Sequence, residues 1–89
     1  MKRAEVTLIN RLGLHARAAA RLVAVAKTFA SRITLEKDGI PVDGKSIMNI
    51  LLLAAPVHSR LQLTVEGEDE DEAFAAIEAL IADRFGEEE

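Results

Sequence analysis

The arrangement in this chain best suited to chemistry is a histidine that ends a glycine-containing loop, in the run Asn10-Arg11-Leu12-Gly13-Leu14-His15-Ala16-Arg17. His15 precedes a predicted helix, so its side chain faces backbone N–H groups that have no partner inside the helix. Those donors and the helix dipole favour an anion there. Arg17 and Arg21 lie one turn apart, and a guanidinium can bind two phosphate oxygens. A phosphoryl group on an imidazole nitrogen suits this pattern, as would a plain surface histidine.

A second motif, residues 39–46, fits the G-x-x-x-x-G-K-[ST] pattern of a nucleotide-binding loop. Such a loop needs free N–H groups, whereas the alternation of Ile40 and Val42 predicts a strand that has already used them. Asp38-Gly39 predicts a hairpin turn into that strand, because these turns require a positive φ. A doubly wound nucleotide-binding sheet also needs more than 89 residues. We interpret the segment as a hairpin, and the rival nucleotide-binding enzyme predicts nucleotide affinity that is lost on Lys45→Ala.

The elements that position these residues follow from hydrophobic periodicity. Alternating apolar and polar side chains predict strands, and apolar side chains three and four apart predict helices. The predicted strands are residues 4–9, 32–37, 40–43 and 60–66, and the predicted helices are residues 16–30, 46–54 and 69–84. Each strand has only one apolar face. The order βαββαβα therefore favours an α+β open-faced sandwich, with a four-stranded antiparallel sheet and three helices on one face, as a single domain over residues 1–89.

Two of the predicted helices carry a clear apolar stripe that should face the core. The predicted stripes are Ala18, Leu22, Val25 and Phe29 in the first helix, and Phe74, Ile77, Ile81 and Phe85 at the last. The short helix over residues 46–54 differs, because it is apolar almost all round. One sheet face cannot cover every side of it, so either loops bury it or it forms an exposed docking patch. Ser46 is its predicted N-cap.

Composition excludes several classes of function. The absence of cysteine excludes disulfides and thiolate chemistry, and two histidines alone make a poor metal site, so we predict no metal and no cofactor. The absence of Trp and Tyr argues against nucleic-acid binding. No apolar run is long enough for membrane insertion, and the N-terminal stretch is too short for a signal peptide, so we expect a cytoplasmic protein. An acidic domain of this size is expected to be monomeric.

Charge is distributed unevenly along the chain. Residues 6–35 contain five basic and no acidic residues, whereas residues 66–89 contain eleven acidic residues and one basic residue. The first region would suit a local anion or an acidic partner, and it could equally be a solvated basic face.

The run Gly13-Leu14-His15-Ala16-Arg17 resembles the active-site signature of the HPr family of phosphocarrier proteins in the phosphoenolpyruvate-dependent phosphotransferase system. A second run, Lys45-Ser46-Ile47-Met48, falls where that family has its regulatory serine. The resemblance extends over the whole chain, and the order βαββαβα also matches. Two motifs in register over a full-length domain are far more specific than either motif alone.

The resemblance implies a carrier rather than an enzyme. His15 would accept a phosphoryl group on Nδ1 from phosphorylated enzyme I and pass it to enzyme IIA-type domains, while Arg17 steadies that group. Ser46 would be a regulatory phosphorylation site for an HPr kinase/phosphorylase. The partner-binding residues would be Arg21, Ile47, Met48 and Leu51, with Ile50 and Leu53 facing inward. The alternative is a non-carrier regulatory binding module of the same fold, whose binding would not depend on His15.

The chain departs from the family pattern at three places. Ala18 stands where many members have proline, and Asn49 stands where the family often has glycine. Residues 56–59 replace a glycine-containing loop. The last two changes border the expected docking surface, so they bear on which partners bind. The resemblance leaves open whether the chain serves a sugar-uptake or a nitrogen-type branch.

Overall fold

The computed structural model describes all residues, 1–89, and contains one four-stranded sheet. The sheet order is β1-β4-β2-β3, and every neighbouring pair is antiparallel. The strands are β1 (Lys2–Thr7), β2 (Arg32–Lys37), β3 (Ile40–Asp43) and β4 (Arg60–Glu66). The predicted antiparallel sheet is confirmed.

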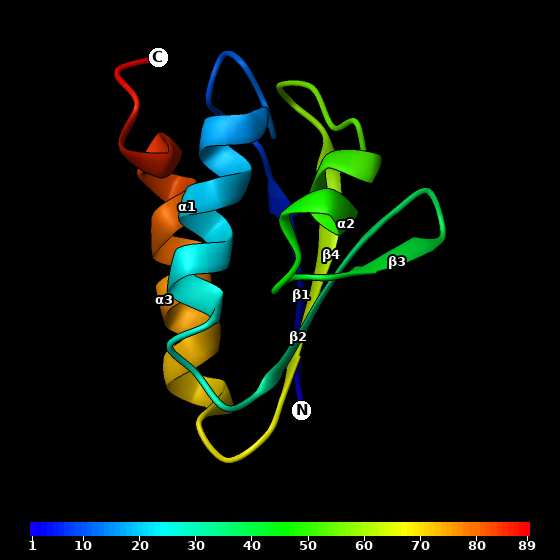
Figure 1. Ribbon diagram of the computed structural model, residues 1–89, viewed down its shortest axis with the longest axis vertical. Coiled ribbons are helices and arrows are strands. Elements are labelled where there is room, and N and C mark those ends of the chain that lie inside the picture. The colour runs from blue at the N-terminus through cyan, green and yellow to red at the C-terminus, as the bar shows by residue number, and fades with distance from the viewer.

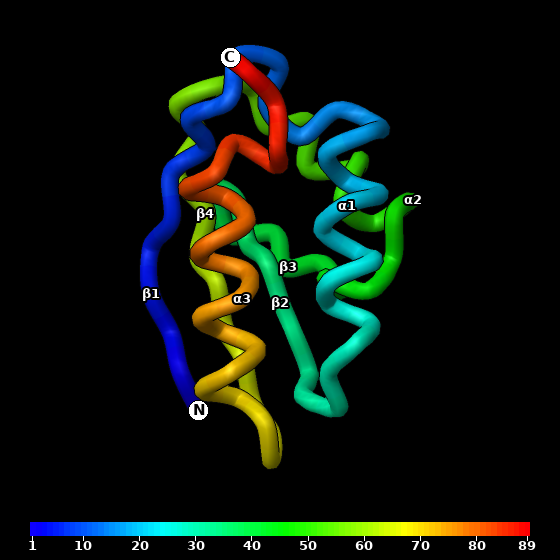
Figure 2. Tube along the Cα trace, turned by 90° about the vertical axis from the view of Figure 1, so that its left-hand side faces the viewer, coloured from blue at the N-terminus to red at the C-terminus, as the bar shows by residue number.

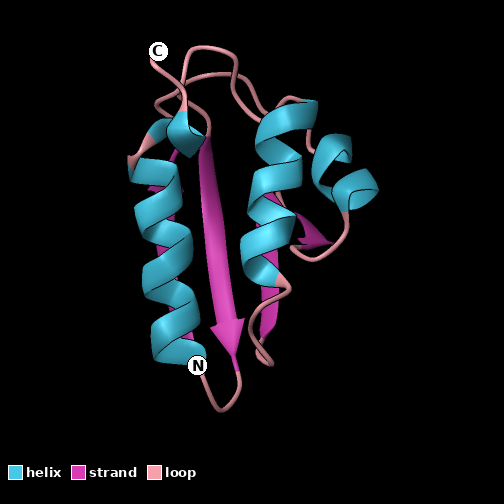
Figure 3. Ribbon diagram, turned by 60° about the vertical axis from the view of Figure 1, so that its left-hand side comes forward, coloured by secondary structure: helices cyan, strands magenta, loops and turns pink.

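Three helices lie on one face of this sheet (Figures 1 and 3). They are α1 (Ala16–Ala26), α2 (Ile47–Leu52) and α3 (Glu70–Ala82), and a 3-10 turn, Arg84–Gly86, follows α3. Helices α1 and α3 lie side by side over the sheet, while α2 packs against α1 and β3. The predicted open-faced sandwich is therefore confirmed. No helix has the length and apolar character that crossing a membrane requires.

The core lies between the helices and the inner face of the sheet. Strand β4 shows why it forms, since its buried side chains alternate with exposed or half-buried polar ones. Facing them, the predicted stripe of the last helix is buried along its whole length. In the first helix the stripe is buried at Ala18 and Leu22, while Val25 and Phe29 are half-buried against the core.

All three helices end earlier than predicted, and each end has a local cause. Helix α2 ends at Leu52 rather than residue 54, because Ala54 adopts a positive φ. Helix α1 ends at Ala26 rather than residue 30. The Asp69 carboxylate accepts hydrogen bonds from the N–H groups of Ala30, at 2.8 Å, and Ser31, at 2.9 Å, which removes those donors from the helix. Helix α3 ends at Ala82, because Arg84 and Phe85 adopt a positive φ and turn the chain.

The first and third strands also test the sequence prediction. Strand β1 spans Lys2–Thr7 rather than residues 4–9, because the last rung of its ladder joins Thr7 to Arg60, where β4 begins. The predicted hairpin turn is confirmed: Asp38 and Gly39 both have a positive φ, and Lys37 pairs with Ile40 across it. Half of the segment that resembles a nucleotide-binding loop, residues 40–43, is thus a paired strand.

The C-terminal tail turns back across the molecule. In Figure 2 the red tail lies beside the blue loop that precedes α1, at the end of the molecule opposite the N-terminus. The Arg11 N–H donates to the Glu89 carbonyl over 2.7 Å, which ties the tail to that loop. The tail, the loop and the start of α1 therefore meet at one end of the fold.

Candidate functional site

The histidine singled out from the sequence lies at the predicted place. His15 is the N-cap residue of α1, with an extended backbone (φ −80°, ψ 178°), and its side chain makes no capping hydrogen bond. Its carbonyl accepts the first hydrogen bond of the helix, from the Ala19 N–H at 2.9 Å. The side chain is 27% exposed, so the imidazole is partly shielded but reachable from solvent.

A glycine in the preceding loop determines where the histidine lies. Gly13 has a φ of +65°, and a Cβ at this position would collide with the Ala55 carbonyl. The same carbonyl accepts a hydrogen bond from the Leu14 N–H at 2.9 Å. Only glycine allows both the left-handed backbone and this close approach, so the loop can hold His15 at the helix start.

The first turn of α1 has open hydrogen-bond donors. The N–H groups of Ala16 and Arg17, which are exposed residues, have no acceptor within the protein, and no acidic side chain lies in the first turn. These donors point out of the N-terminal end of an 11-residue helix, where the dipole adds positive potential. An anion attached to the histidine would meet unpaired donors.

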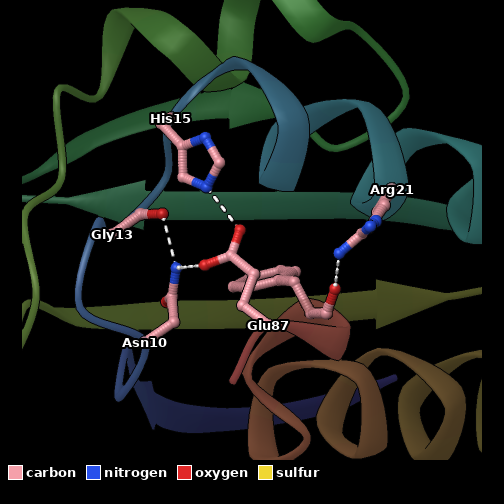
Figure 4. Close-up of polar contacts among 6 residues, drawn as sticks. Asn10, Gly13, His15, Arg21 and Glu87 are labelled. Atoms are coloured by element: carbon pink, nitrogen blue, oxygen red, sulfur yellow. Dashed lines mark hydrogen bonds and ion pairs between the residues drawn. The ribbon is translucent and has the colours of Figure 1, made fainter. Parts of the chain in front are cut away.

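The imidazole is held by a glutamate that the sequence analysis did not single out. His15 Nε2 contacts a carboxylate oxygen of Glu87, and the side chains point toward one another in Figure 4. The other oxygen of Glu87 accepts a hydrogen bond from Asn10 Nδ2 over 3.0 Å. Asn10 is fully buried, and its Nδ2 also donates to the Gly13 carbonyl at 2.8 Å. A buried amide thus joins the carboxylate to the loop that carries His15.

The surroundings keep Glu87 ionised. Burial alone would raise the pKa of this carboxyl, but hydrogen bonds from Asn10 and His15 and the charge of Arg21 outweigh that effect and lower its pKa. An ionised carboxylate can only accept hydrogen bonds, so the shared hydrogen belongs to His15 Nε2. The second ring nitrogen, Nδ1, has no partner and points away from Glu87 (Figure 4).

The rest of the tail contacts the basic residues of the same region. Arg11 pairs with Glu89 at 2.7 Å, and the Arg21 guanidinium donates to the Phe85 carbonyl. The sequence did carry a signal for these contacts: the acid-free region of residues 6–35 was expected to suit an acidic partner, and the chain's own acidic tail supplies part of one. Arg21 is therefore partly used within the fold, and partner binding by it stays a prediction.

Arg17 lies at the same site, but its side chain has no partner there. It lines an open hollow together with His15, Arg21 and the tail, yet its exposed side chain makes no ion pair or hydrogen bond. The hollow is the only place where an unpaired guanidinium, an imidazole and open helix N–H groups come together. No cluster of three metal-ligating side chains occurs in the molecule.

Ser46 is the N-cap of α2, as predicted. Its Oγ accepts from the Asn49 N–H at 3.2 Å and from Asn49 Nδ2 at 2.9 Å. The side chain of Asn49, one of the departures from the family pattern, thus contacts the expected regulatory serine. Lys45 does not form part of an open phosphate loop, because its Nζ donates to the Phe29 carbonyl at 2.7 Å.

The short helix exposes most of its apolar side chains. Ile47, Met48 and Leu51 are exposed, with Met48 at 73%, whereas Ile50 and Leu53 are buried as expected. Leu52, at 76%, is exposed as well and was not predicted. Leu12 in the histidine loop is also exposed. The apolar surface is therefore larger than the residues singled out from the sequence.

Comparisons with known proteins agree on one family. The family model described as "PTS HPr component phosphorylation site" matches residues 2–83. The chain is 48% identical to the phosphocarrier protein HPr of Cupriavidus necator, over 98% of both chains. A crystal structure of HPr-C-His from Thermoanaerobacter tengcongensis superposes with a TM-score of 0.96 at 44% identity, with both chains fully covered. A crystal structure of an HPr dimer from the same organism superposes with a TM-score of 0.79 at 44% identity, over 98% of this chain and 100% of that one.

Proposed function

This chain belongs to the HPr family and is a phosphocarrier protein of the phosphotransferase system, and we propose that His15 is the residue that carries the phosphoryl group. The observation behind this choice is the coincidence of three features at one place. His15 starts a helix whose first N–H groups are open, its Nδ1 has no partner, and the unpaired guanidinium of Arg17 lines the same hollow.

Transfer would proceed by direct displacement at phosphorus. The lone pair of His15 Nδ1 attacks the phosphoryl group of a phosphorylated donor protein, so that a new N–P bond forms as the bond to the donor breaks. The helix N–H groups and Arg17 then face the phosphoryl oxygens and stabilise their negative charge. The reverse displacement passes the group to an acceptor. The histidine acts as a carrier, because it ends each cycle unchanged.

Family membership implies partners of the phosphotransferase system such as enzyme I and enzyme IIA. We assign docking to the exposed apolar side chains of α2, namely Ile47, Met48 and Leu51, with Arg21 beside the histidine. Exposed apolar side chains that lie together are costly in water and typical of protein interfaces, and a flexible methionine adapts to more than one partner. We further expect a monomeric, cytoplasmic carrier, and sedimentation at working concentration checks the monomer.

Ser46 is proposed as a second, regulatory phosphorylation site. A phosphate there would add a charge of about −1.5 to −2 beside the exposed surface of α2. An acidic surface on enzyme I would be repelled by that charge. The hydroxyl is half-buried and accepts two hydrogen bonds from Asn49, so an HPr kinase/phosphorylase would have to displace this contact.

The experiment that tests the carrier assignment is an intact-mass measurement with phosphoenolpyruvate and purified enzyme I. We expect the wild type to gain one acid-labile phosphate and His15→Ala to gain none. His58→Ala is the matched control, because it removes the only other histidine, which lies exposed in a loop. Phosphate on His15→Ala would contradict the assignment, and binding of partners without any transfer would favour a non-carrier module.

A further inference from the structure

The contact between Glu87 and His15 goes beyond what the carrier function requires. Both side chains are partly withdrawn from water, at 13% and 27% exposure, and they lie 72 residues apart in the sequence. The tail that brings them together is anchored independently, by Arg11 on Glu89 and by Arg21 on the Phe85 carbonyl. Glu87 is therefore delivered to the imidazole by a built arrangement and not by a free chain end.

We infer that Glu87 is a positioning residue for phosphoryl transfer: held by Asn10, it keeps the hydrogen of His15 on Nε2 and so presents Nδ1 with a free lone pair. This inference rests on the proposed role of His15. A neutral imidazole carries one hydrogen, and the hydrogen bond made by one nitrogen decides which of the two nitrogens is protonated. Because a carboxylate accepts and cannot donate, the hydrogen stays on Nε2.

The same carboxylate would assist during transfer. As Nδ1 forms its bond to phosphorus, the ring becomes positively charged, while the electron pair of the breaking bond leaves with the donor protein. The Nε2 hydrogen stays in place throughout, so no proton has to move. A carboxylate beside Nε2 stabilises the charged ring, as the acidic residue does for the imidazolium of a Ser-His-Asp triad. Its negative charge lies on the side of the ring away from the phosphoryl group.

Asn10 determines how the amide would be oriented in the variant Glu87→Gln. Its Nδ2 donates to Oε1 of Glu87, and that donation continues only if an oxygen remains at this position. In Glu87→Gln the side-chain oxygen would stay with Asn10, so the new NH2 group would face His15 Nε2. An NH2 group donates, so it would bond the lone pair of Nε2 and move the ring hydrogen to Nδ1. The acceptor nitrogen would then be blocked.

The test combines nitrogen NMR of His15 with the initial rate of phosphorylation by enzyme I and phosphoenolpyruvate. The spectra are recorded at about pH 8.5, where a histidine side chain is ordinarily neutral. The matched control is Glu88→Gln, which makes the same change in an exposed neighbour with no hydrogen-bond partner in the structure. We expect the hydrogen on Nε2 in wild type and in Glu88→Gln, and on Nδ1 in Glu87→Gln. Phosphorylation of Glu87→Gln should be roughly tenfold slower, as for the loss of other groups that orient a histidine.

Two results would overturn this role of Glu87. One is a ring hydrogen distributed identically in wild type and Glu87→Gln. The other is a changed hydrogen position with a rate equal to that of Glu88→Gln. Failure of the proposed function looks different, because the wild type itself would then accept no phosphate on His15. A merely structural role is separated as well, since loss of the tail contact through unfolding would change the whole spectrum and not only the imidazole signals.

Discussion

Two helices in this molecule begin with N-cap residues that behave differently. At the start of α1 the N-cap side chain of His15 makes no capping bond, and the N–H groups of the exposed residues Ala16 and Arg17 remain open. At the start of α2 the N-cap Ser46 accepts from the Asn49 N–H, so the donor is satisfied within the helix. The Ile47 and Met48 N–H groups of α2 also lack an acceptor, so the two starts differ in the N-cap: the Ser46 side chain caps its own helix, whereas the His15 side chain does not.

The difference separates the proposed carrier residue, whose side chain does not cap its helix, from a serine whose side chain does. Serine at an N-cap is explained by helix stability alone, whereas histidine at an uncapped start contributes nothing to the helix by that route. What holds His15 instead is Glu87, from the far end of the chain. The His15 side chain is therefore held by Glu87 and not by the first turn of α1. The N–H groups of that turn stay free for the proposed phosphoryl group.

The largest expected effect is at the open start. Arg17→Ala should slow phosphoryl transfer roughly 30-fold, equivalent to about 2 kcal/mol, because a charge-assisted hydrogen bond to the phosphoryl group is lost. Stopped-flow or quench measurements of transfer from enzyme I would show this, with Arg32→Ala as the control for loss of one exposed positive charge. An Arg17→Ala rate equal to that of the control would remove Arg17 from the site.

The next effect is at the start of α2. Ser46→Asp should raise the KM for phosphorylation by enzyme I about fivefold, the scale of one unfavourable charge contact near the surface, with little change in kcat. The control Thr7→Asp adds the same charge on the exposed face of the sheet. A KM equal to that of the wild type would separate Ser46 from the docking surface.

A stability measurement tests whether Ser46 stabilises α2 as its cap, with the non-capping residue Ser59 as the comparison. Ser46→Ala should lower the free energy of unfolding by about 1 kcal/mol, because α2 loses its cap. Ser59→Ala should change it by less than about 0.5 kcal/mol, since the Ser59 side chain makes no hydrogen bond in the structure. Denaturant unfolding measures both. Equal values for the two variants would show that the capping bond does not stabilise α2.

The smallest expected effect is the contribution of Glu87, which contacts His15, to the free energy of unfolding. The pKa of Glu87 is lowered in the folded protein, chiefly by hydrogen bonds from Asn10 and His15 that overcome its burial. A carboxyl with a lowered folded pKa contributes stability above its unfolded pKa, and this contribution is lost as the pH falls through the folded value. Wild type should therefore exceed Glu87→Gln in stability at neutral pH, and the difference should shrink toward acid. A difference that is constant with pH would contradict this.

Local features were predictable because short-range pattern alone determines them. The turn at Asp38-Gly39, the cap at Ser46 and the buried stripe ending in Phe85 all follow from neighbouring residues. His15 was predicted at the helix start for the same reason. Helix ends were less accurate, since the end of α1 depends on Asp69, a residue far along the chain.

The support of the site could not be predicted in the same way. Asn10 and Glu87 are 77 residues apart, and nothing in a run of glutamates specifies which one reaches the histidine. The turn that redirects the tail needs a positive φ at Arg84 and Phe85, residue types that seldom adopt it. Only the charge asymmetry between residues 6–35 and 66–89 indicated that the two regions attract one another.

The most direct test of the difference between the two helix starts is to record amide and phosphorus NMR spectra before and after phosphorylation by enzyme I. We predict an N–P bond at Nδ1 of His15 and large shifts of the Ala16 and Arg17 N–H signals, as these donors meet phosphoryl oxygens. The N–H signals of Ile47 to Asn49 should move little. Phosphate on another residue, or shifts confined to α2, would contradict the claim that the open start of α1 is the carrier site.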